Sequence, residues 1–102
     1  MNKKDLWFSL TQELYEKIKE YLQNPGLPAT RNKFLMYLFY NYNPKNLKKE
    51  YSFSNATRKM VCIKVTENEL NYINELAEKY NRSLSALARD YAYTFFKEKG
   101  II

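Results

Sequence analysis

The sequence predicts a small, mostly helical α+β domain: two copies of one strand-helix-helix unit, (βαα)2, with two strands and four helices in all. Three observations predict this class. Residues 6–10 and 59–65 each have a side-chain pattern with a period of two, which is typical of strands. A threonine that can cap a helix follows each segment. Apolar residues then recur three or four positions apart, as on one face of a helix.

The first unit opens with a strand whose two faces differ. The inward set is Leu6, Phe8 and Leu10, and the outward set is Asp5, Trp7 and Ser9. Thr11 caps the next helix, whose apolar stripe is Tyr15, Ile18, Tyr21 and Leu22. The segment NPGLP at 24–28 ends that helix, and Thr30 caps a second one. The second stripe is Phe34, Leu35, Leu38, Phe39 and Tyr42, and Asn43-Pro44 ends the helix.

The second unit has the same order of signals. Its strand places Val61, Ile63 and Val65 inward and Met60, Cys62 and Lys64 outward. Thr66 and Glu69 form a capping box before a helix with the stripe Leu70, Ile73, Leu76, Ala77 and Tyr80. Asn81 tolerates the left-handed conformation that ends a helix, and Ser83 caps the last helix, which Gly100 ends. The stripe of this last helix is Leu84, Leu87, Ala88, Tyr91, Ala92 and Phe95.

The two halves correspond in order, although few residues are identical. With a shift of 55, Leu6, Phe8, Leu10, Thr11 and Ile18 match Val61, Ile63, Val65, Thr66 and Ile73. The first turn is two residues longer, so with a shift of 53 Thr30, Phe34 and Leu38 match Ser83, Leu87 and Tyr91. We therefore expect a single domain over 1–102. It comprises one repeat at about 4–42, a linker at about 43–57 and a second repeat at about 58–100.

The composition argues against catalysis. The chain has no histidine, which removes the commonest general base and metal ligand. Its one cysteine has no histidine to activate it, and two glycines cannot make a phosphate-binding loop. Its carboxylates recur at helical spacing among lysines, as on solvent-facing helix surfaces. We expect no enzymatic activity, no metal, no cofactor and no small-molecule substrate.

Hydropathy and charge indicate where the chain acts and on what. The longest apolar stretch, at 34–40, is far shorter than the ~20 residues of a membrane span, and residues 1–7 lack the apolar segment of a signal peptide. One cysteine fits a reducing compartment. We therefore expect a cytoplasmic protein without membrane association. The formal net charge of +6 and pI of about 9.4 make nucleic acid one candidate partner.

The segment VCIKVTENELNYINELAEKYNRSLSALARDY, at 61–91, resembles the ribbon-helix-helix family, and LWFSLTQELYEKIKEYLQ, at 6–23, is similar more loosely. In that family two chains each give one strand to a two-stranded antiparallel ribbon, and four helices form the core. The resemblance therefore implies a single-chain pseudo-dimer. The abundance of Tyr, Lys, Asn and Ile also resembles that of small proteins from filamentous viruses of hyperthermophilic archaea, which implies a host cytoplasm as the location.

Ribbon-helix-helix proteins are typically DNA-binding transcriptional regulators. Their outward strand residues read bases in the major groove, and the start of the second helix of each unit binds phosphate. By position, the resemblance implies base readers at Asp5, Trp7, Ser9, Met60, Cys62 and Lys64. It implies phosphate-binding residues at Arg31, Lys33 and Arg82.

The outward strand residues fit that role poorly, because base reading favours Arg, Lys, Asn and Gln. Instead, the outward strand residues form a surface that we expect another segment or a partner to cover. Its residues are Trp7, Ser9, Met60 and Cys62. A loop or the 43–57 linker could cover it, or a protein or peptide could dock there or along a free ribbon edge by strand addition. We expect a protein- or peptide-interaction module that uses the ribbon face and the groove between the repeats. The alternative is a regulator that binds double-stranded DNA through Lys64, Arg31, Lys33 and Arg82.

Overall fold

The computed structural model describes residues 3–23, 31–44, 46–48 and 58–101. Its elements are β1 (Lys4–Thr11), α1 (Gln12–Tyr21), α2 (Arg31–Asn41), β2 (Arg58–Val65), α3 (Glu67–Tyr80) and α4 (Leu84–Glu98). The predicted class is confirmed at this level: a mostly helical α+β fold with one two-stranded sheet. The expected break at 24–28 and the cap at Thr30 lie outside the described residues. None of the described helices has the length and apolar character needed to cross a membrane.

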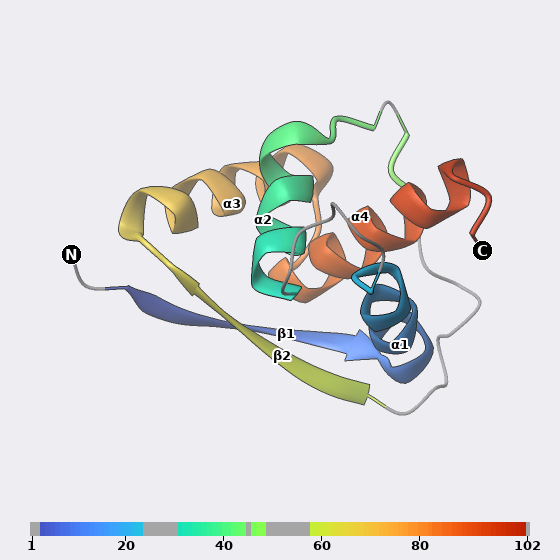
Figure 1. Ribbon diagram of the computed structural model, residues 1–102. Helices are drawn as coiled ribbons and strands as arrows, with labels where there is room; N and C mark the ends of the chain where they lie inside the picture. Colours follow the sequence, from blue (N-terminus) through green and yellow to red (C-terminus); the bar gives the residue numbers. More distant parts are fainter. Residues whose placement is uncertain (1–2, 24–30, 45, 49–57, 102) are drawn as a thin grey trace.

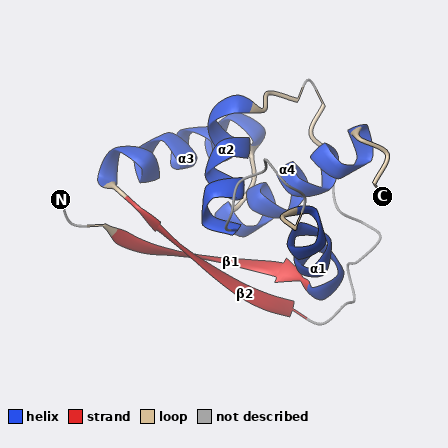
Figure 2. Cartoon of the chain, in the orientation of Figure 1, coloured by secondary structure: helices blue, strands red, loops and turns tan. Residues whose placement is uncertain are grey.

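The two strands form a twisted antiparallel ribbon that lies beneath the helices. All four helices stand on one side of the ribbon, and no described helix covers its other face (Figure 1, Figure 2). Phe8 of β1 pairs with Val61 of β2, and Leu6 pairs with Ile63. The inward side chains are buried by the helices, apart from the partly buried Leu6, as the period of two predicts.

Side-chain caps set the helix boundaries where the sequence indicates. The Thr66 hydroxyl accepts from the Glu69 amide at 3.2 Å, and the Glu69 carboxylate accepts from the Thr66 amide at 2.8 Å, so the capping box is present. Thr11 caps α1 and Ser83 caps α4 through their hydroxyls. Asn81 ends α3 in the left-handed conformation, with φ of 55°. These local signals were sufficient to predict both boundaries of α3 and the starts of α1 and α4.

Helix α4 lies at the centre of the core. It packs against β1 and against each of the other three helices. Every residue from Leu87 to Phe96 except Arg89 is buried, although the sequence predicted one buried stripe. A helix enclosed on all sides buries polar positions too, and Asp90 and Thr94 are accordingly buried.

The described part of the expected linker is fixed against the helices. The Lys48 amide donates to the Thr94 hydroxyl at 2.9 Å, and the Tyr80 hydroxyl donates to the Pro44 carbonyl at 3.3 Å. Leu47 packs against the core. Residues 43, 44 and 46–48 therefore lie along α3 and α4 and leave the outward side of the ribbon uncovered.

Candidate binding surface on the ribbon

The outward ribbon face consists of the side chains that β1 and β2 direct away from the helices. Its members are Asp5, Trp7 and Ser9 of β1 and Met60, Cys62 and Lys64 of β2. The register pairs Asp5 with Lys64, Trp7 with Cys62 and Ser9 with Met60. The side chains named from the sequence are thus brought together as three neighbouring cross-strand pairs.

Two large apolar side chains dominate the outward ribbon face. Trp7 is 54% exposed and Met60 is 58% exposed. They are diagonal neighbours across the two strands, a separation that long side chains can bridge. The described residues do not cover them, and linker residues 49–57 lie outside the description. Cys62 between them is a half-buried free thiol.

An ion pair occupies one end of the outward ribbon face. The Lys64 ammonium donates a hydrogen bond to the Asp5 carboxylate on the opposite strand. This hydrogen bond, with the attraction between the two charges, raises the pKa of the Lys64 ammonium. The lysine therefore stays charged, and the adjacent aspartate balances that charge. A phosphate would meet an ion pair without net charge instead of a lone cation, so its attraction to this position is weakened.

The backbone of β1 is also tied to α4 at Ser9. The Ser9 amide donates to the Ser85 hydroxyl at 2.9 Å, and the Arg89 guanidinium donates to the Ser9 carbonyl at 2.7 Å. Ser85 and Arg89 lie one turn apart on α4, so this helix occupies the outer edge of β1 at Ser9. Neither residue could be predicted as a β1 contact from the sequence, because serine and arginine at this spacing give no signal without the tertiary placement.

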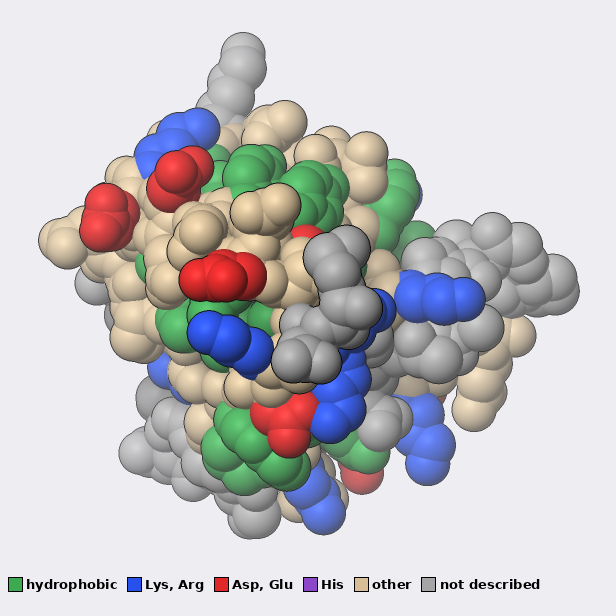
Figure 3. All heavy atoms as spheres, turned by 90° about the vertical axis from the view of Figure 1, so that its left-hand side faces the viewer, with side chains coloured by type: hydrophobic (Ala, Val, Ile, Leu, Met, Phe, Trp, Pro, Cys, Tyr) green, Lys and Arg blue, Asp and Glu red, His purple; other side chains and the backbone are tan. Residues whose placement is uncertain are grey.

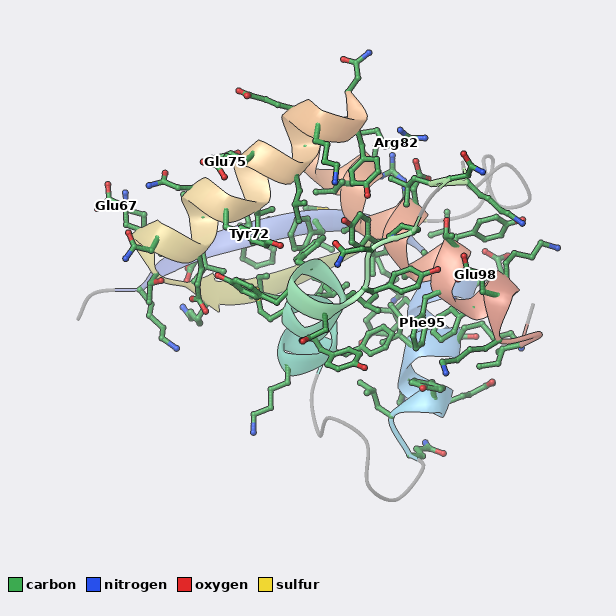
Figure 4. The ribbon with its side chains drawn as sticks, turned by 90° about the horizontal axis from the view of Figure 1, so that it is seen from above. Glu67, Tyr72, Glu75, Arg82, Phe95 and Glu98 are labelled. Atoms are coloured by element: carbon green, nitrogen blue, oxygen red, sulfur yellow. The ribbon has the colours of Figure 1, made fainter. Side chains whose placement is uncertain are left out.

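The predicted phosphate-binding residues lie in different settings. Arg31 begins α2, and its side chain lies outside the described residues, whereas Lys33 is exposed on the same helix. Arg82 is largely buried: its guanidinium donates to Asp90 at 2.6 Å, to the Tyr80 carbonyl at 2.7 Å and to the Leu47 carbonyl at 3.2 Å. Figure 4 shows Arg82 near the corner between α3 and α4. An anion at the start of α4 would have to displace these partners.

A shallow groove of about 570 Å³ lies at this corner, within the second strand-helix-helix unit. It is lined by Asn74, Ala77, Glu78, Asn81, Arg82, Ser83 and Leu84. Glu78 is an acid, and Asp90 already balances the charge of Arg82. The lining therefore does not favour a polyanion.

A stacked pair of tyrosine rings joins α2 to α3. The rings of Tyr40 and Tyr72 stack with centroids 4.5 Å apart and planes within 2°, and the Tyr72 hydroxyl donates to the Phe39 carbonyl at 3.0 Å. In Figure 4 Tyr72 points toward α2. Burial, and then the nearby Glu69 carboxylate, raise the pKa of Tyr40. The stack thus fastens two helices together beside an acid, a poor setting for nucleic-acid bases.

Charge is mixed on the face seen from the end at which α3 begins. There acidic and basic side chains are interspersed with apolar patches (Figure 3). Among the described residues no group of three or more His, Cys, Asp or Glu side chains is placed to hold a metal ion.

Comparison with family models, with curated proteins and with solved structures found no match. The function is therefore argued from the outward ribbon face.

Proposed function

We propose that this protein is a non-enzymatic binding module that captures a protein or peptide through the outward ribbon face; a contribution from a groove between the two repeats stays a prediction from the sequence. In this proposal the chain is a tandem (βαα)2 pseudo-dimer of ribbon-helix-helix type. The order strand-helix-helix, which occurs twice, and the antiparallel pairing of the two strands support it. A cytoplasmic location and a viral source stay predictions from composition.

The observation that carries the proposal is the exposure of Trp7 and Met60 on a ribbon face that the described residues leave open. Large contiguous apolar surfaces on monomers are uncommon and often functional. Tryptophan is enriched among the residues that dominate protein interfaces. Cys62 extends this apolar centre, and the Ser9 hydroxyl and the Asp5–Lys64 ion pair border it with polar groups and balanced charge. An apolar centre with a polar rim is typical of a protein interface.

DNA binding is the second candidate. The ribbon's outward face carries no described helix, so it could enter a major groove, and the net charge of +6 favours a polyanion. The described chemistry supports this less well, because Lys64 is paired with Asp5 and the Arg82 guanidinium is held by Asp90. Methionine has no hydrogen-bond donor, and tryptophan has a single indole N–H, so neither can make the bidentate contacts by which Arg, Asn and Gln read base edges.

The experiment compares capture of partners from cell extract by the parent protein and by Trp7→Ala and Met60→Asp. Both changes lie on the surface, so thermal unfolding should stay close to the parent, while capture is lost. A buried aromatic anchor contributes about 2 kcal/mol or more, which lowers affinity roughly thirtyfold. Tyr37→Ala is the matched control, since Tyr37 is similarly exposed but lies on α2. Equal capture by all four proteins would refute the proposal.

A further inference from the structure

The two outer edges of the ribbon differ in what their backbone groups contact. At Ser9 both the amide and the carbonyl bond to α4, so both point away from β2. In an antiparallel pair such residues alternate with those that bond across the ladder. Its partner Met60 therefore belongs to a non-hydrogen-bonded pair, and so do Cys62 and Lys64. The N–H and C=O groups of these three β2 residues point to the outer edge of β2.

That outer edge of β2 is open along the part of the chain that the structure describes. No described residue donates to or accepts from the backbone of Met60, Cys62 or Lys64 across this edge. An unpaired row of amides and carbonyls can template another strand. The row borders the outward ribbon face directly, since the same three residues supply half of its side chains.

The charge of β2 indicates the kind of segment that fits. Its sequence, RKMVCIKV, contains three basic residues and no acid, and Asp5 is the only acid on the described outward ribbon face. The basic side chains and the net charge of +6 oppose the approach of a second copy or of a basic segment. An acid opposite Lys64 and an apolar residue opposite Met60 would make favourable cross-strand pairs.

We infer that the partner of the outward ribbon face adds as a third strand to the outer edge of β2, and that it is an extended segment of another protein in which apolar and acidic residues alternate. The inference rests on the proposed function and adds the partner's conformation and charge to it. Main-chain hydrogen bonds to Met60, Cys62 and Lys64 would supply affinity, and the side chains beside them would supply selectivity.

The test follows amide hydrogen exchange by NMR in the full chain. The probe is a synthetic peptide of about eight residues, the length of β2, that alternates valine and glutamate; a valine-lysine peptide is its control. We expect the acidic peptide to slow exchange at Met60, Cys62 and Lys64 at least about tenfold. Exchange at Val61 and Ile63, whose amides already face β1, should change little.

Two variants separate the edge from the rest of the surface. Cys62→Pro removes one outward N–H but no ladder bond, so the strand should persist and the effect of the peptide should disappear. Lys64→Glu should weaken binding of the acidic peptide about fivefold, which is the upper end of the range for one exposed ion pair. The same variant should bind the valine-lysine peptide more tightly than the parent protein does. Lys97→Glu on α4 makes the same charge change at an exposed site elsewhere and should have no effect.

Several results would overturn the inference. The inference fails if neither peptide slows amide exchange at the β2 edge, or if both peptides slow it equally. It also fails if exchange there slows as the protein concentration rises without peptide, because a second copy would then be the occupant. If Trp7→Ala abolishes partner capture but Cys62→Pro does not, the partner binds the outward ribbon face without adding a strand. The proposed function would then stand and the strand addition would fail.

Discussion

Replacing Phe34 by alanine should destabilise the whole domain, because this ring joins three helices. Phe34 of α2 is 1% exposed. Its ring lies 5.6 Å from that of Tyr21 at the end of α1, 5.7 Å from that of Phe95 and 5.9 Å from that of Phe96, both on α4. Alanine would remove three aromatic contacts and leave a cavity that rigid helices on every side cannot close.

The cost of Phe34→Ala should be about 3–5 kcal/mol, the range for a buried phenylalanine. A domain of this size loses about 4–8 °C of melting temperature per kcal/mol, so the midpoint should fall by at least about 12 °C. Thermal and urea unfolding followed by circular dichroism would measure both quantities. Tyr37→Ala is the control on the same helix, since that side chain is 47% exposed and its loss should cost at most about 0.5 kcal/mol. If the two variants melt together, the assignment of Phe34 to the core is wrong.

Three further predictions concern the shared core. Fragments 1–50 and 51–102 should each show little cooperative unfolding, because β1 and β2 are each other's described strand partner; a sharp thermal transition in either fragment would contradict this. Burial raises the pKa of Tyr91 above its unfolded value near 10, so its contribution to stability is complete below pH 10 and is lost as pH rises through the folded pKa. Urea midpoints between about pH 8 and 11 should therefore fall less steeply in Tyr91→Phe than in the parent. Arg82→Ala should cost about 3–5 kcal/mol in urea unfolding, because it removes the guanidinium that is paired with the buried Asp90 carboxylate; a loss under 1 kcal/mol would contradict the importance of the pair.

The sequence was sufficient to predict the helix boundaries and strand faces whose signals are local. Caps act within three residues of chain, and the capping box of Thr66 and Glu69 has the expected bonds. The alternation in β2 fixed which side chains face outward, and the register with β1 then placed Trp7 beside Cys62. In α1 the buried stripe is centred on Leu14 and Ile18, with Tyr15, Tyr21 and Leu22 only partly buried, because α1 lies at the edge of the core.

The features that could not be predicted from the sequence depend on contacts between residues that are far apart in the chain. The position of Arg82 before α4 suggested an anion-binding role, but Asp90, eight residues later on the buried helix, binds its guanidinium. The bonds from Ser85 and Arg89 to Ser9 span more than 70 residues and required the docking of α4 on β1. The Asp5–Lys64 ion pair became visible only with the register. Each of these contacts changes how the candidate site is interpreted, and local periodicity could show none of them.

The most direct test of the central claim measures duplex DNA binding across a salt series for the parent protein, Lys64→Ala and Trp7→Ala. We expect weak affinity for DNA at physiological salt, about equal for defined and random duplexes, and little change in that affinity with Lys64→Ala. The same Trp7→Ala protein should lose capture of its protein partner while it remains folded. Each phosphate contact adds about 0.9 to the slope of log affinity against log salt concentration. Nonspecific binding will therefore be recognisable from its loss of affinity as salt rises. Much tighter binding to one defined duplex than to random DNA, with that difference removed by Lys64→Ala, would contradict a protein- or peptide-binding role for the outward ribbon face.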